Sequence, residues 1–191
     1  MTGRPGAALA ALLLTIGLAV PAGAAEPAKA EPCGACHGAD GNSATEGIPS
    51  LAGQPAYYLL MQLVLQRDKQ RVVEAMLPFV ENMTDADAEA LAAHFAAQEL
   101  KPQPGPADPA LMETGKRLAE ANHCGQCHLP DFRGREQMAR LAGQREEYLL
   151  KALQDFKAGR RAGFDGTMTE AVYNLAETDL PALAHYLARQ P

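Results

Sequence analysis

Two pentads of the type C-x-x-C-H stand in this chain of 191 residues, at Cys33–His37 and again 91 positions later at Cys124–His128. The pattern is typical of covalent attachment of a c-type haem. The two sulfurs reach two points on one porphyrin edge, and the histidine that follows is held against one face of the iron as an axial ligand. The sequence therefore predicts two covalently bound haem c groups. The predicted attachment residues are Cys33, Cys36, Cys124 and Cys127, and the predicted proximal ligands are His37 and His128.

Three other uses of paired cysteines compete with haem. A zinc site would gather all four cysteines and would not need a histidine directly after each pair. A thioredoxin-like redox pair needs a preceding strand and a βαβ context, and the sequence shows neither. Two disulfides would suit an exported chain, but they would leave the duplicated histidine without a role. The complete pentad favours haem over all three.

A low-spin electron carrier needs a second axial ligand on each iron, and two methionines are candidates. Met76 follows His37, and Met168 follows His128, at almost the same separation along the chain and at equivalent places in the two halves. A thioether ligand raises the haem potential relative to bis-histidine ligation. We predict that Met76 binds the first iron and Met168 the second.

The competing hypothesis is bis-histidine ligation. His94 and His185 follow the histidine of their own pentad at the same separation along the chain. Both fall inside predicted helices, and the best alignment of these helices pairs Ala93, not His94, with His185. We interpret both histidines as helix-surface or core-edge residues.

An internal repeat extends well beyond the pentads. Leu51–Gln54 matches Leu141–Gln144, Tyr58–Leu60 matches Tyr148–Leu150, and the offset between the copies stays between 90 and 92. These matches indicate a duplicated domain. The segment Lys101–Pro106 has too many prolines for a helix and is predicted to be a linker. The predicted division is a signal peptide over 1–25, domain 1 over 26–100, the linker over 101–109 and domain 2 over 110–191.

Each copy is predicted to be helical, because apolar residues recur at helical spacing and no convincing strand alternation is found. Pro55 suits a first helical position, and Thr84 with Asp87 resembles a capping box. The opening helix of the first copy is expected to be short or missing, because Pro27 and Pro32 lie within it. The predicted helices are 55–69, 84–98, 109–121, 145–158 and 178–189. The predicted fold class is all-α, with two tandem helical domains joined by a Pro-rich linker.

The segment 1–25 predicts export. Arg4 supplies a positive start, Ala7–Val20 is an apolar run of the length of a signal-peptide core, and Ala22–Ala24 fits the small-residue cleavage pattern. The run is short for a membrane span, which needs about 20 apolar residues. We expect a cleaved signal peptide and a periplasmic mature chain. The alternative is an uncleaved N-terminal anchor.

The charge of the chain differs between its halves. Residues 26–100 hold four Lys and Arg against eleven Asp and Glu, and residues 101–191 hold twelve of each. An acidic, exported chain does not favour nucleic-acid binding. The basic residues could be a solvated surface with arginines on haem propionates, or they could make the molecule a dipole that steers each half to a different partner. These residues are Arg133, Arg135, Arg140, Arg145, Lys157, Arg160 and Arg161.

Three stretches of the first half, Cys33–Ser43, Ile48–Leu59 and Met83–Phe95, resemble the dihaem cytochrome c₄ family, and the similarity covers nearly all of the mature chain. The resemblance implies two small helical cytochrome c domains related by a pseudo-twofold axis. His37 and His128 match the family's proximal ligands, and Met76 and Met168 fall where its distal methionines sit. It also implies electron transfer in the periplasm, often toward a haem-copper terminal oxidase.

One position departs from the family pattern. Cytochrome c domains usually have a proline whose carbonyl receives the other N–H of the proximal histidine. Pro49 fits this role in the first half, but Ala139 occupies the place in the second. We therefore expect this contact to come from a different backbone geometry in the second half, and we expect unequal haem potentials.

The function predicted from these observations is a single-electron carrier and not an enzyme, because both axial positions of each haem are filled. Its expected partners are redox proteins such as a membrane donor complex, a terminal oxidase or a dehydrogenase subunit, with peripheral membrane association as an option. The first alternative is a cytochrome subunit of a larger dehydrogenase such as flavocytochrome c sulfide dehydrogenase. The second is a dihaem peroxidase, which needs one haem able to lose its distal ligand.

Overall fold

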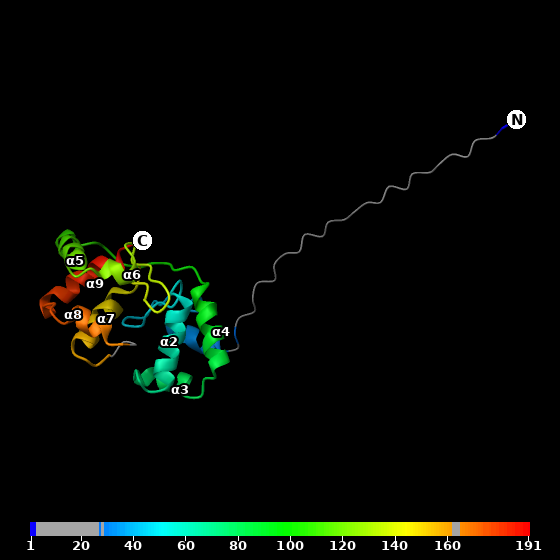
Figure 1. The fold of residues 1–191 in the computed structure, drawn as a ribbon, viewed down its shortest axis with the longest axis horizontal. Coiled ribbons are helices and arrows are strands. Elements are labelled where there is room, and N and C mark those ends of the chain that lie inside the picture. The colour runs from blue at the N-terminus through cyan, green and yellow to red at the C-terminus, as the bar shows by residue number, and fades with distance from the viewer. Residues whose placement is uncertain (3–26, 28, 162–164) are drawn as a thin grey trace.

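The computed structural model describes residues 1–2, 27, 29–161 and 165–191, which form two groups of helices joined by a non-helical segment (Figure 1). Apart from one isolated β-bridge between Arg135 and Met138, the regular structure of these described residues is helical. The all-α prediction is therefore confirmed. Of the predicted signal peptide over 1–25, residues 3–25, which include the cleavage pattern at Ala22–Ala24, lie outside the described residues.

The first group of helices is built around the contact between two amphipathic helices of twelve residues each. Buried residues recur along α4 at Ala88, Leu91, Ala92 and Phe95, which is the spacing of one helix face. This face packs against α2. The predicted helices over 55–69 and 84–98 are confirmed, although Pro55 is the N-cap and not the first helical residue. The elements are α1 (Ala30–His37), α2 (Ala56–Arg67), the 3₁₀ turn η1 (Glu74–Met76), α3 (Leu77–Val80) and α4 (Asp85–Ala96).

The predicted capping box at the start of α4 is present. The hydroxyl of Thr84 accepts a hydrogen bond from the Asp87 backbone N–H, and the Asp87 carboxylate accepts one from the Thr84 N–H. Two of the amide groups that a helix start leaves unpaired are thereby satisfied. Lys29 adds an ion pair to Asp87 and ties the segment before α1 to this helix. Together these bonds hold the pKa of Asp87 at about 2.

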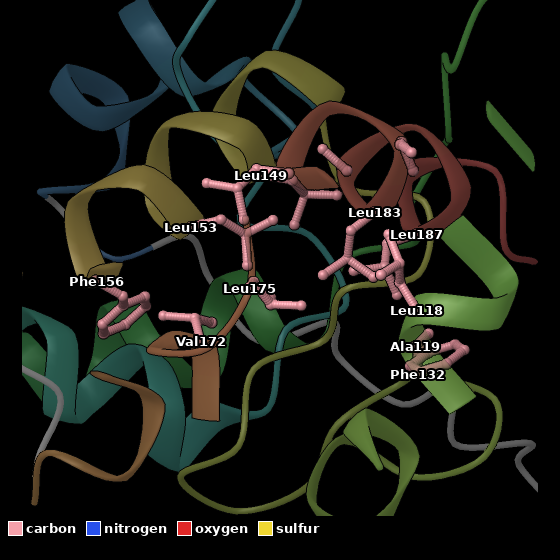
Figure 2. Packing of buried hydrophobic residues seen from close by; sticks show 14 of the residues in the cluster. Leu118, Ala119, Phe132, Leu149, Leu153, Phe156, Val172, Leu175, Leu183 and Leu187 are labelled. Carbon is pink, nitrogen blue, oxygen red and sulfur yellow. The ribbon is translucent and has the colours of Figure 1, made fainter. Parts of the chain in front are cut away.

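The second group repeats this plan and adds one long helix. Figure 2 shows Leu149, Leu153 and Phe156 of α7 in one apolar layer with Leu183 and Leu187 of α9. The predicted helices over 109–121, 145–158 and 178–189 are confirmed. Here the elements are α5 (Pro109–Ala121), α6 (Cys124–His128), α7 (Glu146–Lys157), α8 (Thr167–Val172), η2 (Glu177–Asp179) and α9 (Leu180–Ala188).

The added helix, α5, crosses α9 closely at Gly115. A Cβ atom on this glycine would lie 2.1 Å from the backbone oxygen of Ala182 and 2.5 Å from Cβ of Tyr186. The start of α5 is fixed by Asp108, whose carboxylate accepts hydrogen bonds from the N–H groups of Ala110 and Leu111. In the second half α5 precedes the pentad helix α6. In the first half the pentad helix is α1, and no helix precedes it among the described residues, so α5 has no counterpart there.

The segment between α4 and α5 is fastened at both ends. Lys101 donates its backbone N–H to Asn42 and forms an ion pair with Asp40, both in the loop after α1. At the other end the Arg189 guanidinium donates to the carbonyls of Pro104 and Pro106. The linker is therefore held against both halves.

No helix in the described part of the chain combines the length and the apolar character that a membrane crossing requires.

Candidate haem-binding sites

Each pentad forms a short helix that presents its two cysteines one turn apart, α1 in the first half and α6 in the second. Residues three apart in a helix lie on the same face, so both sulfurs can reach one ligand edge. Cys33 and Cys124 are half-buried against the apolar core of their half, and Cys36 and Cys127 are exposed. None of the four pairs with another cysteine in a disulfide. Burial raises the pKa of the Cys33 and Cys124 thiols.

The histidine of each pentad is buried, with 7 % exposure for His37 and 6 % for His128. Nδ1 of His37 lies 2.8 Å from the carbonyl oxygen of Pro49, and Nδ1 of His128 lies 2.8 Å from that of Ala139. A carbonyl can only accept, so each Nδ1 carries the hydrogen and each Nε2 keeps its lone pair.

Nε2 of His128 is buried and has no hydrogen-bond partner within the described structure. A buried polar atom without a partner is costly, which points to a ligand at this nitrogen. Burial lowers the pKa of both pentad histidines, and the hydrogen bond to the backbone carbonyl opposes this effect without overcoming it. A neutral imidazole with a free Nε2 is the form that binds a metal. The observed state of both histidines therefore fits the predicted iron ligation.

The second half does not need a proline to receive the histidine N–H. The carbonyl of Ala139 takes the same bond at the same length as that of Pro49. The loop leading to it nevertheless differs in composition. Leu129 and Phe132 adopt positive φ angles, 69° and 56°, at the places where Gly38 and Gly41 do so in the first half. The expectation of a different backbone geometry for this contact is therefore wrong: the contact is preserved, and the loop differs in its residue types.

The four cysteines lie as two separate pairs. Within the described ranges, no three side chains of His, Cys, Asp or Glu gather in the way a metal-ion site requires. The arrangement is that of two pentad helices on two cores, and not of one four-cysteine cluster.

The two candidate methionines occupy matching surroundings. Met76 ends η1, and Met168 is the second residue of α8. Both are half-buried, and each borders the apolar core of its own half. Cys33 borders the same core as Met76, and Cys124 the same core as Met168. Each half thus brings its predicted distal ligand and its first attachment residue to one apolar cluster.

The competing histidine of the second half is fully hydrogen-bonded within the protein. Nε2 of His185 accepts from the backbone N–H of Asp108 at 2.9 Å, and Nδ1 lies 3.0 Å from Oε1 of Glu146. Neither ring nitrogen is left for iron. His94 differs, because its Nε2 is buried without a partner in the described structure and its ring lies edge-on against Phe95. The two histidines are therefore not equivalent, as the helix alignment indicates.

Two tyrosines and two arginines meet where the halves contact each other. The guanidinium of Arg161 donates to the hydroxyls of Tyr58 and Tyr148 at 3.1 and 3.2 Å, and that of Arg71 donates to Tyr148 at 3.4 Å and to Gln62 at 2.6 Å. The pairs Tyr58 and Tyr148, and Arg71 and Arg161, each keep the offset of 90. Among the described residues no carboxylate pairs with either arginine.

The cluster of Arg71, Arg161, Tyr58 and Tyr148 is positively charged and would be stabilised by a nearby anion. Burial raises the pKa of Tyr148, but the guanidinium groups of Arg161 and Arg71 outweigh burial and lower it to about 7. Arg161 is only 8 % exposed, and a buried cation without an anion is unfavourable. The propionate carboxylates of a haem are suitable partners for such guanidinium groups. No local motif marks Arg71, Tyr58 and Tyr148 as site residues; the one indication in the sequence is that the tyrosines and arginines match between the two copies.

The seven clustered basic residues named above, among the twelve of the second half, do not form one free patch. Arg161 is buried, and Arg145 donates to the carbonyl of Ser43 in the first half. Arg140 donates to the carbonyls of Ala142 and Pro191. Arg133 pairs with Asp131, Arg145 with Glu147 and Arg160 with Asp155. Lys157 donates a hydrogen bond to the Tyr173 carbonyl. Local structure therefore uses most of these charges.

Comparison with known proteins assigns the family. The model described as "Cytochrome c" matches residues 112–190, and that described as "Cytochrome C oxidase, cbb3-type, subunit III" matches residues 20–95. Cytochrome c4 from Azotobacter vinelandii is 38% identical, over 94% of this chain and 97% of its own length. The thiosulfate dehydrogenase electron acceptor of Thiomonas intermedia is 33% identical, over 88% of this chain and 82% of its own.

The fold agrees with these sequence relatives. Reduced recombinant cytochrome c4 from Pseudomonas stutzeri superposes with a TM-score of 0.79 at 32% identity, covering 87% of this chain and 99% of that one. The chain therefore belongs to the cytochrome c4 family, and is a dihaem cytochrome that carries one covalently bound haem c in each half and acts in electron transfer.

Proposed function

We propose that this protein is a periplasmic carrier that passes single electrons between redox proteins of a respiratory chain, toward a terminal oxidase. The export pattern over 1–25 and membership of the cytochrome c4 family support the proposal. The two haem domains are 26–100 and 110–191, joined by the linker over 101–109. A histidine and a methionine of each half would hold its haem iron, so the bound groups would exchange single electrons and would need no substrate at the metal.

In each half, different residues attach the haem and bind its iron. Bound haem supplies one-electron chemistry between iron(III) and iron(II). In the first half Cys33 and Cys36 would attach the haem, and His37 through Nε2 and Met76 through its sulfur would hold the iron. The main support for this proposal is the tautomer of the pentad histidines. Nδ1–H donates to a backbone carbonyl, which leaves Nε2 free to bind iron.

The second half has the same set of residues and a buried histidine nitrogen. Cys124 and Cys127 would attach the haem, and His128, whose Nε2 is buried without a partner in the described structure, and Met168 would hold the iron. Thioether ligation in both halves gives higher potentials than bis-histidine ligation would. Higher potentials suit delivery of electrons to an oxidase.

A second candidate function is electron acceptor of a dehydrogenase. It is favoured by the similarity to the thiosulfate dehydrogenase electron acceptor of Thiomonas intermedia. Purification from the native periplasm separates the two functions. A stable complex with a dehydrogenase supports the second, and a free dihaem protein that is rapidly oxidised by oxidase-containing membranes supports the first.

Optical spectroscopy of the purified holoprotein tests the ligand assignment. A haemochrome assay is expected to give two haems per chain, and the oxidised protein is expected to show the weak far-red band of a sulfur–iron bond. Met76→Ala and Met168→Ala should each remove about half of its intensity, because each removes one of two such bonds. Met112→Ala, a half-buried methionine of α5, is the control and should leave the band intact. An unchanged band in either test variant would contradict the assignment for that half.

A further inference from the structure

Two glutamines form a reciprocal exchange of hydrogen bonds between the halves. Oε1 of Gln144 accepts from the backbone N–H of Ser50 at 2.8 Å, and its Nε2 donates to the carbonyl of Ser50 at 2.8 Å. Oε1 of Gln54 accepts from the N–H of Arg140 at 2.9 Å, and its Nε2 donates to the carbonyl of Arg140 at 2.9 Å. Gln144 is 4 % exposed and Gln54 6 %, so water does not compete with these bonds.

The peptide units that the glutamines bind are the ones that hold the haem histidines. The N–H of Ser50 belongs to the same peptide unit as the carbonyl of Pro49, which receives Nδ1–H of His37. The N–H of Arg140 belongs to the same unit as the carbonyl of Ala139, which receives Nδ1–H of His128. One continuous chain of hydrogen bonds therefore runs from each pentad histidine, through one peptide, to a glutamine of the other half.

Such a chain transmits polarisation. A peptide bond has partial double-bond character, so charge moves between its nitrogen and its oxygen. When the N–H donates to a good acceptor, the carbonyl oxygen of the same unit becomes more negative and accepts more strongly, and a buried setting enhances this cooperativity. A stronger acceptor on Nδ1 makes Nε2 a better donor to a metal. A better donor favours iron(III), and the reduction potential falls.

We propose that Gln144 tunes the haem of the first half through His37, and that Gln54 tunes the haem of the second half through His128. Each half thus sets part of the potential of the other. The inference rests on the proposed function, in which these two histidines bind iron. Both glutamines are positioning residues, since they act through a backbone peptide and a histidine.

The two glutamines are not fully equivalent, because their Oε1 atoms accept different numbers of hydrogen bonds. Oε1 of Gln144 also accepts from the backbone N–H of Arg145 at 2.9 Å. The residue after Gln54 is Pro55, which has no N–H. Oε1 of Gln54 therefore has no second backbone N–H of this kind, and it polarises the Ala139–Arg140 peptide more strongly than Gln144 polarises the Pro49–Ser50 peptide. The effect of Gln54 on the second haem should exceed that of Gln144 on the first.

Two single variants of the holoprotein test the crossed pattern. Gln144→Met and Gln54→Met keep the side-chain volume and remove both hydrogen bonds. The potential of each haem is measured by redox titration, and the Nδ1–H proton of each histidine is followed by NMR in the reduced protein. Gln144→Met should raise the potential of the first haem and shift the His37 resonance upfield. Gln54→Met should do the same to the second haem and to His128, with a larger shift.

Gln62→Met is the matched control. Gln62 also accepts a hydrogen bond across the interface, from Arg161 at 3.3 Å, but it does not contact a histidine-binding peptide. It should move neither histidine resonance. Small-angle scattering reports whether the halves stay docked in each variant. If a variant separates them, both histidines lose their glutamine and both resonances should move upfield together.

Three results would overturn the inference. In a variant whose halves stay docked, the histidine Nδ1–H resonance of the opposite half could stay unmoved, or only the histidine of the substituted half could shift. In a variant whose halves separate, both histidine resonances could stay unmoved. Failure of the proposed function is recognised separately in the wild-type protein, by a haem content other than two or by the absence of histidine ligation. A wild type with two histidine-ligated haems and variants without the crossed pattern would refute only the tuning.

Discussion

At the residue scale, His185 is the clearest example of a histidine whose neighbours decide its role. Its ring lies between the start of α5 and the acidic side chain of Glu146, and both ring nitrogens are used. Burial raises the pKa of Glu146, but hydrogen bonds from Arg189 and His185 outweigh it, so the net shift is downward. His185 therefore fastens α5 to α7 and α9, and it has no nitrogen for iron.

Replacing His185 with Ala tests this structural role, and alanine is also the residue at the matching position of the first half, Ala93. The change leaves the Asp108 amide without its acceptor and creates a cavity, and should lower the free energy of unfolding by about 2 kcal/mol or more. Urea unfolding measures this cost. The far-red band of the oxidised protein should keep its intensity, and loss of half of that intensity would make His185 a candidate iron ligand again.

The residues of the pentads could be predicted from sequence because their chemistry is local. Two sulfurs and a histidine within one pentad define an attachment site without any knowledge of the fold. The glutamine exchange could not be predicted in the same way. Gln54 and Gln144 are visible as a matched pair, but their partners Ser50 and Arg140 lie in the opposite half, and only the relative placement of the halves brings them together.

At the element scale, the crossing of α5 and α9 fixes the architecture of the second half. Gly115 is buried at this crossing, and the backbone of α9 passes over it. The absence of a side chain allows the two helices to approach to this distance. The first half has no such crossing among its described residues, and α2, α4 and the short α3 form its core together with Ala30 of α1 and Met83.

Gly115→Ala should destabilise the second half. Alanine favours a helix over glycine by about 1 kcal/mol, but its Cβ would meet backbone and not a flexible side chain. Overpacking of this kind costs about 1–3 kcal/mol, and a contact of 2.1 Å with the Ala182 oxygen places this site at the upper end. Thermal unfolding of the holoprotein measures the effect. Lys116→Ala, on the exposed side of α5, is the control, and a Gly115 variant as stable as that control would contradict the argument.

Helix positions were largely predictable, because periodicity and capping act over a few residues. The box at Thr84 and Asp87, the cap at Asp108 and the amphipathic face of α4 are all readable from sequence. The short elements η1, α3 and α8 were not predicted, since one or two turns have too few residues for a period and depend on tertiary contacts. The methionines of both predicted distal sites lie in such short elements.

At the scale of the whole molecule, charge is divided unequally between the halves. The first half is strongly acidic, and the second, with equal numbers of acidic and basic residues, holds several of its arginines in internal contacts. Long-range steering therefore depends on the net charge of the first half more than on a basic patch on the second. A positively charged partner should approach the first half preferentially.

A redox-inert paramagnetic cation tests this preference without electron transfer. Hexaamminechromium(III) at low ionic strength should broaden NMR resonances of the first half more than those of the second. The difference should fade as salt rises, because the Debye length falls from about 30 Å at 0.01 M to about 10 Å at 0.1 M. The anionic hexacyanochromate(III) should not show the preference. Equal broadening of both halves by the cation would count against charge-based steering.

The reciprocal pairing of Gln54 with Arg140 and of Gln144 with Ser50 has a consequence for the origin of the molecule. Contacts of the form i to j and j to i are isologous, which is how two identical subunits meet in a homodimer with twofold symmetry. A chain with a single haem and this surface would already be complementary to a copy of itself. Fusing two such copies by gene duplication would keep this pairing, and the linker, fastened to both halves, holds the two partners in one chain.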